Sequence, residues 1–582
     1  MNMLARAPAT DRRLCLRTIL IFFAILATGL AVMTTQCADP DLWGHVQYGR
    51  EILQDGVLPR TATWTYAAEG APWVNHENIA ELLLAWTVDT LGANALPWMK
   101  LVIASLLVTM MITAARKSGA SWLSTGILVA LMGSCVQFHW HFRPQILTYL
   151  SLSAMLALWQ HVFREFDATE YTSLEGTQSR LKTLWLLPPL MCFWANSHGG
   201  FAAGVAIMAA YHGLLCLNVV RSTGFQHCRF LLSLSIITLV TVAATLINPY
   251  GFGLWEFLLA ALKLPRPEIS DWGSLEFFSS DSVRVWCLIA VAGISLARGC
   301  QRRDVPQLIV LALLLWQGIS HCRHLSIFAI TCGFWIPRHL ERLVSSGCET
   351  LERLQPDRRS EGQGTAGSLL AGLLLIASVV RLAPLMNGIP VERSEYPVSA
   401  MQYMADRKLN GKILATFNWA QYAIGCFADS TGPLRHSRVA VDGRFETCYP
   451  RVITDICFDF WLGTADPSHR YRSPNAPPFD PAKALELEQP DLVLLCREQR
   501  PSARVMEQHA DQWLLLYQDS LAQLWGRRSK FENPESVWHI AESDRQISNI
   551  PQQGSVPWPA FPNALNPQER LTMHSVSTAN AE

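Results

Sequence analysis

Long runs of apolar residues, separated by short polar loops, fill most of the chain up to about residue 386. Each run holds about 15–22 residues, roughly the length that a helix needs to cross the hydrocarbon core of a bilayer. Such a run crosses lipid as a helix, because lipid offers no partner to unpaired backbone N–H and C=O groups. The pattern predicts about eleven spans, over residues 16–36, 95–115, 122–138, 145–163, 183–197, 201–220, 230–247, 283–298, 305–320, 324–337 and 367–386.

Basic residues set the expected orientation of these helices. Four arginines precede the first run, and most other Lys and Arg residues of this region lie in every second loop. Loops rich in Lys and Arg stay on the cytoplasmic side. We therefore expect a multi-pass protein of the inner membrane with a cytoplasmic N-terminus and an extracytoplasmic C-terminal part. A cleaved signal peptide ending near Cys37 is the alternative interpretation of the first run, and it leaves the next loop on the same side.

Residues 387–529 show a different pattern, in which strand-like and helix-like segments alternate. This alternation predicts a small α/β domain outside the membrane. Strands are expected at 412–417, 438–441, 491–496, 512–517 and 520–525, and helices at 397–409, 450–462, 481–488 and 502–509. The polar, proline-rich residues 530–582 are expected to form a disordered tail. The chain is thus expected to have a transmembrane domain, 1–386, with an outer loop at 37–94, followed by the α/β domain and the tail.

The composition supports a membrane protein and excludes several other classes. Of the 582 residues, 50% are hydrophobic and 16% are charged, and the mean hydropathy is +0.17. A soluble globular protein carries about 25% charged residues. The 47 basic residues balance the 47 acidic ones, so no excess of positive charge indicates a nucleic-acid partner. None of the 15 cysteines belongs to a CxxC pair or has zinc-finger spacing.

Uncommon polar residues gather in the loops that we expect on the outer side. The loops contain residues 39–45, 73–77, 139–145, 196–200, 248–251 and 321–324. Two interpretations are open: the loops share one polar cavity, or the side chains lie separately at the membrane interface. Two acids spaced i, i+2 directly after the first span favour the shared cavity.

A further polar motif, Asp442-Gly443-Arg444, follows a predicted strand of the outer domain. A glycine at this position suits a sharp turn. The paired Asp442 and Arg444 either bind a polar ligand or dock on the membrane region, or they form a structural salt bridge within the turn. The sequence leaves these alternatives open.

Together these features resemble a known superfamily. The motifs D-x-D-L-W-x-H, W-x-x-H-E, R-P-Q, N-x-H-G, N-P-Y-G, R-H and D-G-R stand at 39–45, 73–77, 143–145, 196–199, 248–251, 323–324 and 442–444, and a group of bacterial membrane proteins shares them. A polytopic bundle with an acidic first outer loop and an outer soluble domain resembles the GT-C membrane glycosyltransferases. That superfamily includes protein mannosyltransferases, aminoarabinose transferases and oligosaccharyltransferases. The resemblance, over about residues 37–445, implies a GT-C-like bundle that moves a sugar from a polyprenyl-phosphate donor to an acceptor on the outer face.

The resemblance also implies roles for individual residues. In GT-C families an acid of the first outer loop is a general base or a ligand of a divalent metal, so Asp39 and Asp41 are candidates for both roles, with Mg²⁺ or Mn²⁺ as the ion. His45 and Glu77 complete the expected catalytic set. Cationic groups would stabilise the leaving phosphate. The expected substrate-binding residues are His139, His141, Arg143, Asn196, His198, Arg323, His324, Asp442 and Arg444.

Two other functions remain possible for this sequence. A transporter or flippase for a lipid or polysaccharide ranks second, because the predicted spans contain almost no Asp or Glu. Glu81 and Asp89 lie in an apolar stretch, 79–93, that we expect to be an interfacial or re-entrant outer helix. A non-catalytic membrane protein whose outer domain binds a partner is the third interpretation.

Overall fold

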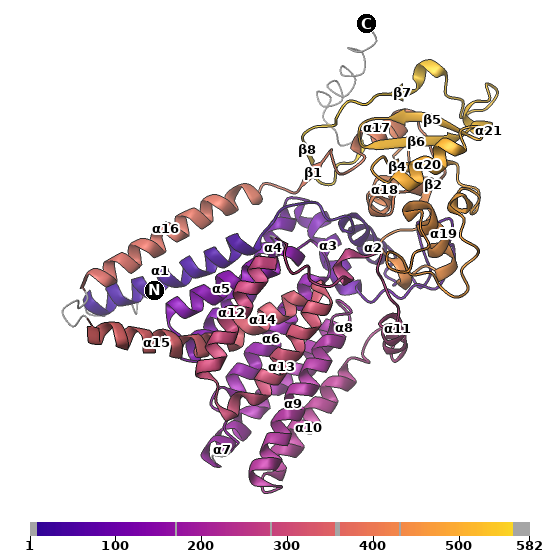
Figure 1. Cartoon of the computed structure of the whole chain (residues 1–582). Coiled ribbons are helices and arrows are strands. Elements are labelled where there is room, and N and C mark those ends of the chain that lie inside the picture. Colours follow the sequence, from indigo (N-terminus) through magenta and orange to yellow (C-terminus); the bar gives the residue numbers. More distant parts are fainter. Residues whose placement is uncertain (1–8, 169–170, 280–281, 355–360, 430–431, 563–582) are drawn as a thin grey trace. The chain divides into compact units, whose positions relative to one another are not determined.

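The computed structural model describes residues 9–168, 171–279, 282–354, 361–429 and 432–562 (Figure 1). The chain forms two compact units that are each discontinuous in sequence. The first unit comprises Met1–Thr35, Pro97–Phe252 and Ile269–Asn387, and the second comprises Gln36–Leu96, Gly253–Glu268 and Gly388–Glu582.

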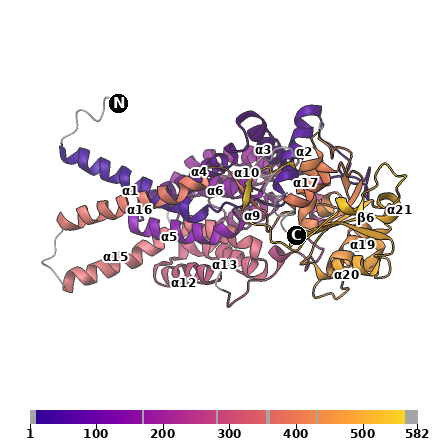
Figure 2. The same cartoon turned by 90° about the horizontal axis from the view of Figure 1, so that it is seen from above.

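The first unit is a bundle of helices. Its members are α1 (Ala9–Met33), α4 (Ala95–Lys117), α5 (Trp122–Val136), α6 (Gln145–Phe163), α7 (Tyr171–Arg180), α8 (Leu187–Ala195), α9 (Phe201–Thr223), α10 (Cys228–Ala244), α12 (Ser282–Gly299), α13 (Val305–Ser320), α14 (Leu325–Trp335), α15 (Pro337–Leu354) and α16 (Glu361–Leu385). Helix α1 packs against α16 and α5, and α1 and α16 lie side by side in both ribbon views (Figure 2).

Every predicted span folds as a helix, but the helices differ in length. Within the described residues, seven helices are long and apolar enough to cross a membrane: Cys15–Met33, Ala95–Lys117, Trp122–His139, Gln145–Phe163, Phe201–Thr223, Ser282–Gly299 and Ala366–Leu385. Helices α8, α10, α13 and α14 have 9, 17, 16 and 11 residues. The predicted polytopic bundle is therefore confirmed, and seven of the about eleven predicted spans are long enough to cross a membrane within the described residues.

Helix α14, the second shortest of the expected spans, lies in the centre of the bundle. All eleven of its residues are buried, and it packs against α5, α6 and α13. A helix that is apolar on every side is typical of a position surrounded by other helices. Because protein rather than lipid surrounds it, α14 has no need to match the bilayer thickness.

The second unit contains a six-stranded mixed sheet with the strand order β3-β2-β4-β6-β5-β7. Strand β2 pairs in parallel with β3 and β4, β6 pairs antiparallel with β4 and β5, and β7 adds to β5 in parallel. A separate pair joins β1 and β8. The strands are β1 (Pro390–Glu392), β2 (Lys412–Ala415), β3 (Arg438–Val439), β4 (Leu492–Cys496), β5 (Trp513–Gln518), β6 (Ala522–Arg527), β7 (Gln546–Ile547) and β8 (Ser555–Pro557).

Helices of the second unit come from three parts of the chain. They are α2 (Leu42–Asp55), α3 (Asn78–Leu91), α11 (Gly253–Ala261), α17 (Val398–Asp406), α18 (Ala420–Phe427), α19 (Arg451–Leu462), α20 (Arg500–Gln508) and α21 (Arg528–Phe531). All five predicted strands of the α/β domain form. Of the four predicted helices, three are α-helical, and the segment near 481 is a short 3₁₀ helix, Pro481–Leu485. The sequence did not predict α2 or α18.

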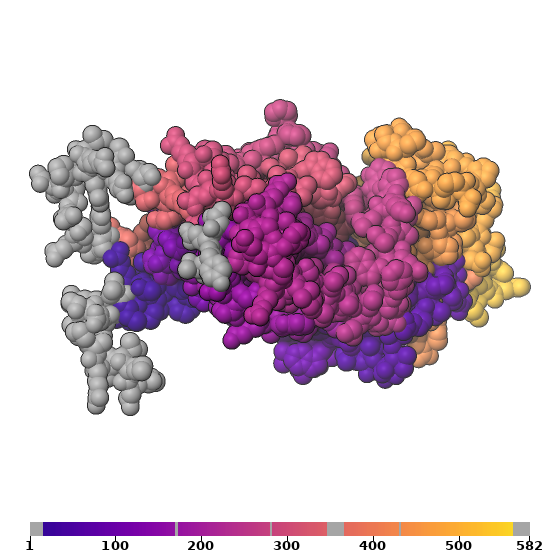
Figure 3. Space-filling view, turned by 90° about the horizontal axis from the view of Figure 1, so that it is seen from below, coloured from indigo at the N-terminus to yellow at the C-terminus, as the bar shows by residue number. Residues whose placement is uncertain are grey.

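The first outer loop belongs to the second unit, although the sequence assigned it to the transmembrane domain. Thr65 forms a parallel bridge with Val439 at the open edge of β3: the N–H of Val439 donates to the carbonyl of Trp64, and the carbonyl of Val439 accepts from the N–H of Tyr66. The backbone N–H of Val74 donates to Thr447 at 2.9 Å. The segment Gly253–Glu268 also joins this unit, and its Arg266 forms an ion pair with Glu446. In the space-filling view this magenta segment lies against the orange surface of the same unit (Figure 3). These hydrogen bonds and ion pairs explain why the compact units do not divide at residue 386.

The prediction of a disordered tail was wrong for residues 530–562. Residues 530–562 carry β7 and β8, and Trp558 packs against Trp43 with ring centroids 6.2 Å apart. The indole N–H of Trp43 donates to the carbonyl of Pro559 at 2.9 Å. The polar composition gave a wrong prediction of disorder, because hydrogen bonds with other strands of the unit stabilise this segment, which has no core of its own. The remainder of the predicted tail, 563–582, lies outside the described residues.

Candidate active site

The first outer loop places its two aspartates at the start of α2. Asp39 is 3% exposed, and its Oδ1 atom accepts a hydrogen bond from the backbone N–H of Asp41 at 3.0 Å. Asp41 is the N-cap residue of α2, is half-buried, and its carbonyl accepts from the N–H of His45. Asp39 therefore shapes the turn before the helix, and Asp41 stands one helical turn before His45.

Behind this turn, His45 meets Glu77, the N-cap residue of α3, and Glu81 within that helix. One ligand atom each from His45, Glu77 and Glu81 lies within 4.8 Å of the others. The His45 Nδ1 atom is 3.4 Å from Glu81 Oε1, and Asn75 Nδ2 donates to Glu81 Oε2 at 2.5 Å. His45 and Glu81 are buried, whereas Glu77 is partly exposed. The arrangement is a small acidic pocket with one imidazole and one solvent-facing carboxylate.

Close packing of α2 against α3 makes this meeting possible. At Gly49, one turn after His45, an added Cβ would lie 2.5 Å from the carbonyl carbon of Glu81 and 2.8 Å from the Cβ of Ala85. Carbon atoms in contact ordinarily lie about 3.5–4.0 Å apart. Only a glycine therefore allows α2 to approach α3 closely enough for His45 to reach Glu81.

The charges of this pocket act strongly on His45. Burial alone would lower the pKa of this imidazole. The hydrogen bond with Glu81 and the negative charges of Glu77, Glu81 and Asp41 outweigh burial, and they raise the pKa to about 9. The pocket is therefore built to hold positive charge, either a proton on His45 or a metal ion.

The donor set and its spacing fit a divalent metal. Two ligands on a tetrahedral ion with 2.0–2.1 Å bonds stand about 3.3 Å apart. The 3.4 Å between His45 Nδ1 and Glu81 Oε1 matches that spacing and is long for a charged hydrogen bond. An imidazole with two carboxylates suits Mn²⁺ or Zn²⁺ better than Mg²⁺, which prefers oxygen ligands alone. Among the described residues, His45, Glu77 and Glu81 are thus better metal candidates than Asp39 and Asp41.

Asp41 lies next to Gln421, a tightly packed side chain on α18 of the outer domain. An added Cβ at Gly44 would lie 2.5 Å from Gln421 Cδ, and one at Gly443 would lie 2.6 Å from Gln421 Nε2. The Gly443 position would also overlap the Asp41 carboxylate. Gln421 is 3% exposed, and its Oε1 atom has no hydrogen-bond partner. The glycine between Asp442 and Arg444 is therefore required for the close approach of Asp41 and Gln421.

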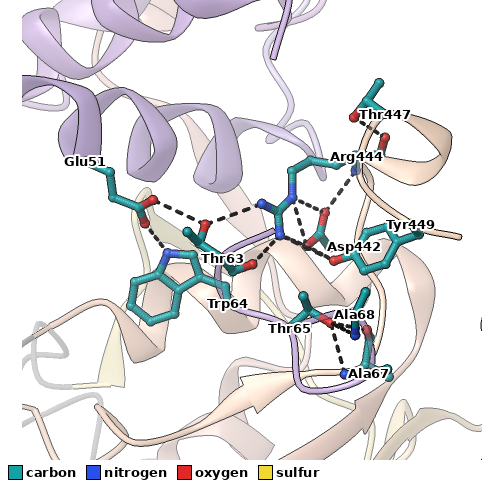
Figure 4. A network of polar contacts seen from close by, with 11 residues as sticks. Glu51, Thr63, Trp64, Thr65, Ala67, Ala68, Asp442, Arg444, Thr447 and Tyr449 are labelled. Atoms are coloured by element: carbon teal, nitrogen blue, oxygen red, sulfur yellow. Dashed lines mark hydrogen bonds and ion pairs between the residues drawn. The ribbon is translucent and has the colours of Figure 1, made fainter. Parts of the chain in front are cut away.

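Asp442 and Arg444 form the structural salt bridge that was one of the two interpretations of this motif (Figure 4). The guanidinium donates to both oxygens of Asp442, at 2.7–3.2 Å, and to the carbonyl of Thr63 at 2.6 Å. The Tyr449 hydroxyl donates to Asp442 Oδ2 at 2.5 Å. Burial opposes the charge of Arg444, but the Asp442 carboxylate raises the pKa of Arg444 above its ordinary value.

Arg444 also connects the C-terminal part of the second unit with the first outer loop. Its guanidinium carbon lies 4.5 Å from the ring centroid of Tyr48 and 4.7 Å from that of Trp73, both in the first outer loop. Next to it, Thr63 and Trp64 hydrogen-bond to Glu51 on α2 (Figure 4). The network holds α2 and the loop after it against the outer domain, and so it positions Asp41 and His45.

In the first unit, the predicted cationic residues gather around His139. Arg143, Arg323, His141 and Asp271 all lie close enough to His139 to interact with it electrostatically. The guanidinium of Arg323 stacks on the Trp272 ring at 4.6 Å. The structure therefore brings the predicted outer loops at 139–145 and 321–324 together, with Asp271 and Trp272 beside them. A single cavity that also includes the acids of the first loop stays a prediction.

The other predicted substrate-binding residues mostly have backbone or neighbouring partners. Asn196 donates at 2.8 Å to the carbonyls of Cys192 and Ile247, which ties the ends of α8 and α10 together. His198 Nδ1 accepts from the N–H of Gly200 at 2.9 Å. His141 Nε2 lies 2.8 Å from the carbonyl of Phe138, and His324 Nδ1 lies 3.1 Å from Gln317 Nε2. Asn196 therefore has a structural role.

Sequence reasoning missed Glu81, Gln421 and Asn75. Glu81 follows Glu77 by four residues, so both stand on one face of a helix. That spacing is present in the sequence, but the stretch 79–93 was interpreted from its apolar residues alone, as an interfacial or re-entrant helix. No local sequence pattern marks Gln421 as a site residue, because its position depends on Gly44 and Gly443, which are both more than twenty residues away in the chain.

Comparison with known proteins supports the expected fold. No protein-family model matches the chain, and no curated protein matches its sequence. The fold is similar to that of the oligosaccharyltransferase AglB from Archaeoglobus fulgidus in complex with an inhibitory peptide and a dolichol-phosphate. The TM-score is 0.51 at 11% identity, over 83% of this chain and 69% of that chain. The same enzyme tethered with an acceptor peptide matches with a TM-score of 0.51 at 10% identity, over 94% and 76% of the two chains.

A second type of solved structure is also similar. ArnT from Cupriavidus metallidurans in the apo state matches with a TM-score of 0.47 at 12% identity, over 87% of this chain and 97% of that chain. Oligosaccharyltransferases belong to the superfamily that the motifs indicated. The chain therefore has a fold similar to that of a solved oligosaccharyltransferase, with a helical bundle and a C-terminal α/β domain, as the sequence predicted.

Proposed function

We propose that this chain is an integral-membrane glycosyltransferase that moves a sugar from a polyprenyl-phosphate donor to an acceptor on the outer face of the inner membrane. The acidic pocket of Asp41, His45, Glu77 and Glu81 carries the proposal. The similar archaeal oligosaccharyltransferase was solved with a dolichol-phosphate, a lipid of the proposed donor class.

Asp41 is the proposed general base. In the transfer, the acceptor oxygen forms a bond to C1 of the sugar, and the acceptor proton passes to the Asp41 carboxylate. The bond between C1 and the phosphate oxygen breaks, and its electron pair leaves with the polyprenyl phosphate. Asp41 suits this role better than Asp39, because it is half-buried, whereas Asp39 is buried and its Oδ1 atom holds the turn before α2.

His45, Glu77 and Glu81 are the proposed ligands of a divalent cation, with Mn²⁺ or Zn²⁺ favoured by the donor set. A bound cation would supply positive charge for the phosphate of the donor. Glu81 is oriented for this role by Asn75, which occupies its second oxygen.

Arg143 and Arg323 are the proposed contacts of the donor phosphate in the first unit. Arginine binds phosphate well because its planar guanidinium presents several donors in a fixed fork. His139, His141 and His324 are proposed to line the same region, and Asp271 balances part of its charge. This assignment gives the leaving group a stabilising environment of its own.

The test is transfer by the purified full chain in liposomes, with synthetic undecaprenyl-phosphate hexoses as donors and envelope extract as the source of acceptor. Release of undecaprenyl phosphate and labelling of the acceptor are both measured. Asp41→Asn should lower transfer by at least 100-fold, because a positioned general base contributes about 10²–10⁴-fold. Asp89→Asn is the matched control: Asp89 lies on the same outer loop, is exposed, and pairs with Arg50 at 2.8 Å.

Full transfer by Asp41→Asn would contradict the assigned base, and full transfer by His45→Ala together with Asp41→Asn would contradict the site. Labelled lipid that crosses the bilayer without chemical change would instead identify a flippase. Melting temperatures of the variants, measured on the same samples, separate a lost catalytic group from a lost fold.

A further inference from the structure

Helix α3 of the first outer loop has an apolar face that the rest of the described chain leaves partly exposed. The side of α3 that carries Glu81 and Ala85 is buried and packs against Gly49 of α2. The other side carries four apolar residues at intervals of three and four positions, which place them on one face of a helix. This apolar face consists of Ile79, Leu82, Leu83 and Trp86, all partly exposed, with Trp86 at 49%.

The charge at the edge of the apolar face is paired. The stretch 79–91 contains two charged residues, Glu81 on the buried side and Asp89 at the edge of the apolar face. The Asp89 carboxylate accepts two hydrogen bonds from the guanidinium of Arg50 on α2, at 2.8 and 2.7 Å. A helix at the surface of a soluble domain ordinarily turns polar residues outward. An outward apolar face of this kind therefore indicates apolar surroundings.

The end of α3 leads directly into a helix that is long and apolar enough to cross a membrane, α4. Three residues separate Leu91 from Ala95, and the N–H groups of Gly92 and Ala95 donate to the carbonyls of Val88 and Gly92, both at 3.0 Å. Three residues reach at most about 10 Å. The headgroup layer of a bilayer is roughly 5–8 Å thick on each side. The end of α3 must therefore lie close to the headgroups.

The apolar surface continues on α2 and on α4. Positions 45, 49 and 50 of α2 meet positions 81, 85 and 89 of α3, so the two helices run in the same direction. Near the end of α2, on the side where α4 begins, Leu53 is 47% exposed and Val57 is 67% exposed. Trp98, in the first turn of α4, is 54% exposed. Indole rings are enriched where a membrane meets water, so Trp86 and Trp98 both suit that level.

We propose that α3 lies flat in the lipid–water interface, with its apolar face turned toward the acyl chains. Helices of this kind bury their apolar face by about 5–10 Å. A helix of 14 residues is about 21 Å long and does not cross the hydrocarbon core. The opposite side carries Glu81, which accepts a hydrogen bond from Asn75, and a carboxylate is costly within that core. The interfacial position is therefore favoured over a re-entrant one.

This position also sets the height of the acidic pocket above the membrane. Glu81 and Trp86 stand on opposite sides of α3, and a helix is about 10–12 Å in diameter. The pocket then lies about one helix diameter from the acyl chains, near the level of lipid phosphates. The role of this height in binding a donor phosphate rests on the proposed function, whereas the lipid contact itself does not.

The test is photo-crosslinking of the purified full chain in liposomes of phosphatidylethanolamine and phosphatidylglycerol, without a sugar donor. Trp86→p-benzoylphenylalanine and Leu83→p-benzoylphenylalanine should each attach phospholipid on irradiation, measured by the mass of the chain. The same substitution at Val102, which is 58% exposed on α4, is the positive control. Val537, which is 93% exposed and follows α21 on the other side of the second unit from α3, is the negative control (Figure 1). Position 86 should give at least tenfold more lipid adduct than position 537.

Fragment masses locate each adduct along the lipid. Attachment to the glycerol or to the first part of the acyl chains is expected. Attachment near the terminal methyl groups would overturn the interfacial position in favour of a re-entrant one. A crosslinked dimer without lipid adduct would show that a second copy covers the face, and no adduct at 83 and 86 alongside labelling at 102 would overturn the proposal. Lipid adducts from a chain that transfers no sugar would sustain this inference and contradict the proposed function alone.

Discussion

Replacement of Gly49 by alanine should separate the two helices that form the acidic pocket. The new Cβ would lie 2.5 Å from the carbonyl carbon of Glu81, about 1 Å closer than an ordinary carbon–carbon contact. Helix α2 must therefore move by roughly 1 Å, whereas metal–ligand distances tolerate about 0.2 Å. We expect Gly49→Ala to lower Mn²⁺ or Zn²⁺ affinity at least tenfold and to cost about 1–3 kcal/mol of stability, as overpacking does.

Calorimetric titration of the metal and thermal unfolding, both on the full chain in detergent, measure these two effects. Gly293→Ala is the control, because a Cβ at this position within helix α12 meets nothing within 4 Å. Adding Ala85→Gly to Gly49→Ala should not restore binding, since the main obstacle is the Glu81 backbone. Wild-type affinity in Gly49→Ala would refute the reasoning, and rescue by Ala85→Gly would move the critical contact to the side chain.

Three further predictions follow from other parts of the structure. Arg444→Ala should lower the free energy of unfolding by about 3–5 kcal/mol, because it leaves a buried carboxylate without its partner, and chemical denaturation measures the loss. Trp43→Ala should cost about 3–5 kcal/mol in the same assay, since this ring is 1% exposed. Arg143→Gln or Arg323→Gln should weaken undecaprenyl-phosphate binding about tenfold, the effect of one lost charged hydrogen bond, while Arg298→Gln should not; equal affinities would contradict the phosphate assignment.

Hydropathy located the helices of the bundle well, but it could not give the lengths that matter for spanning. The α14 segment has the apolar composition of a span, yet neighbouring helices rather than lipid bury all of it. Composition reports that a residue avoids water, and it does not distinguish a lipid neighbour from a protein neighbour. Alternation of strand and helix patterns likewise predicted the strands of the outer domain, because each strand carries its own local run of buried apolar residues.

The sequence predicted which residue types form the candidate site, but it did not predict which side chains contact one another there. The motif around Asp41 and His45 indicated chemistry, but the third member, Glu81, depends on how closely α2 approaches α3 at Gly49. The polar stretch after residue 530 was taken for disorder because its strands pair with segments far away in the chain. Contacts of this kind leave no local periodicity, so a single sequence cannot reveal them.

The hydrogen bond between Trp43 and Pro559 ties the start of α2 to a residue made 516 positions later. At about 5–20 residues per second, a ribosome needs roughly half a minute to two minutes to bridge that interval. During biosynthesis the start of α2 therefore lacks this hydrogen bond until residue 559 has been made. Nascent chains that end before residue 559 should accordingly present an incompletely stabilised Asp41 loop to proteases, so that the acidic pocket is completed only late in translation.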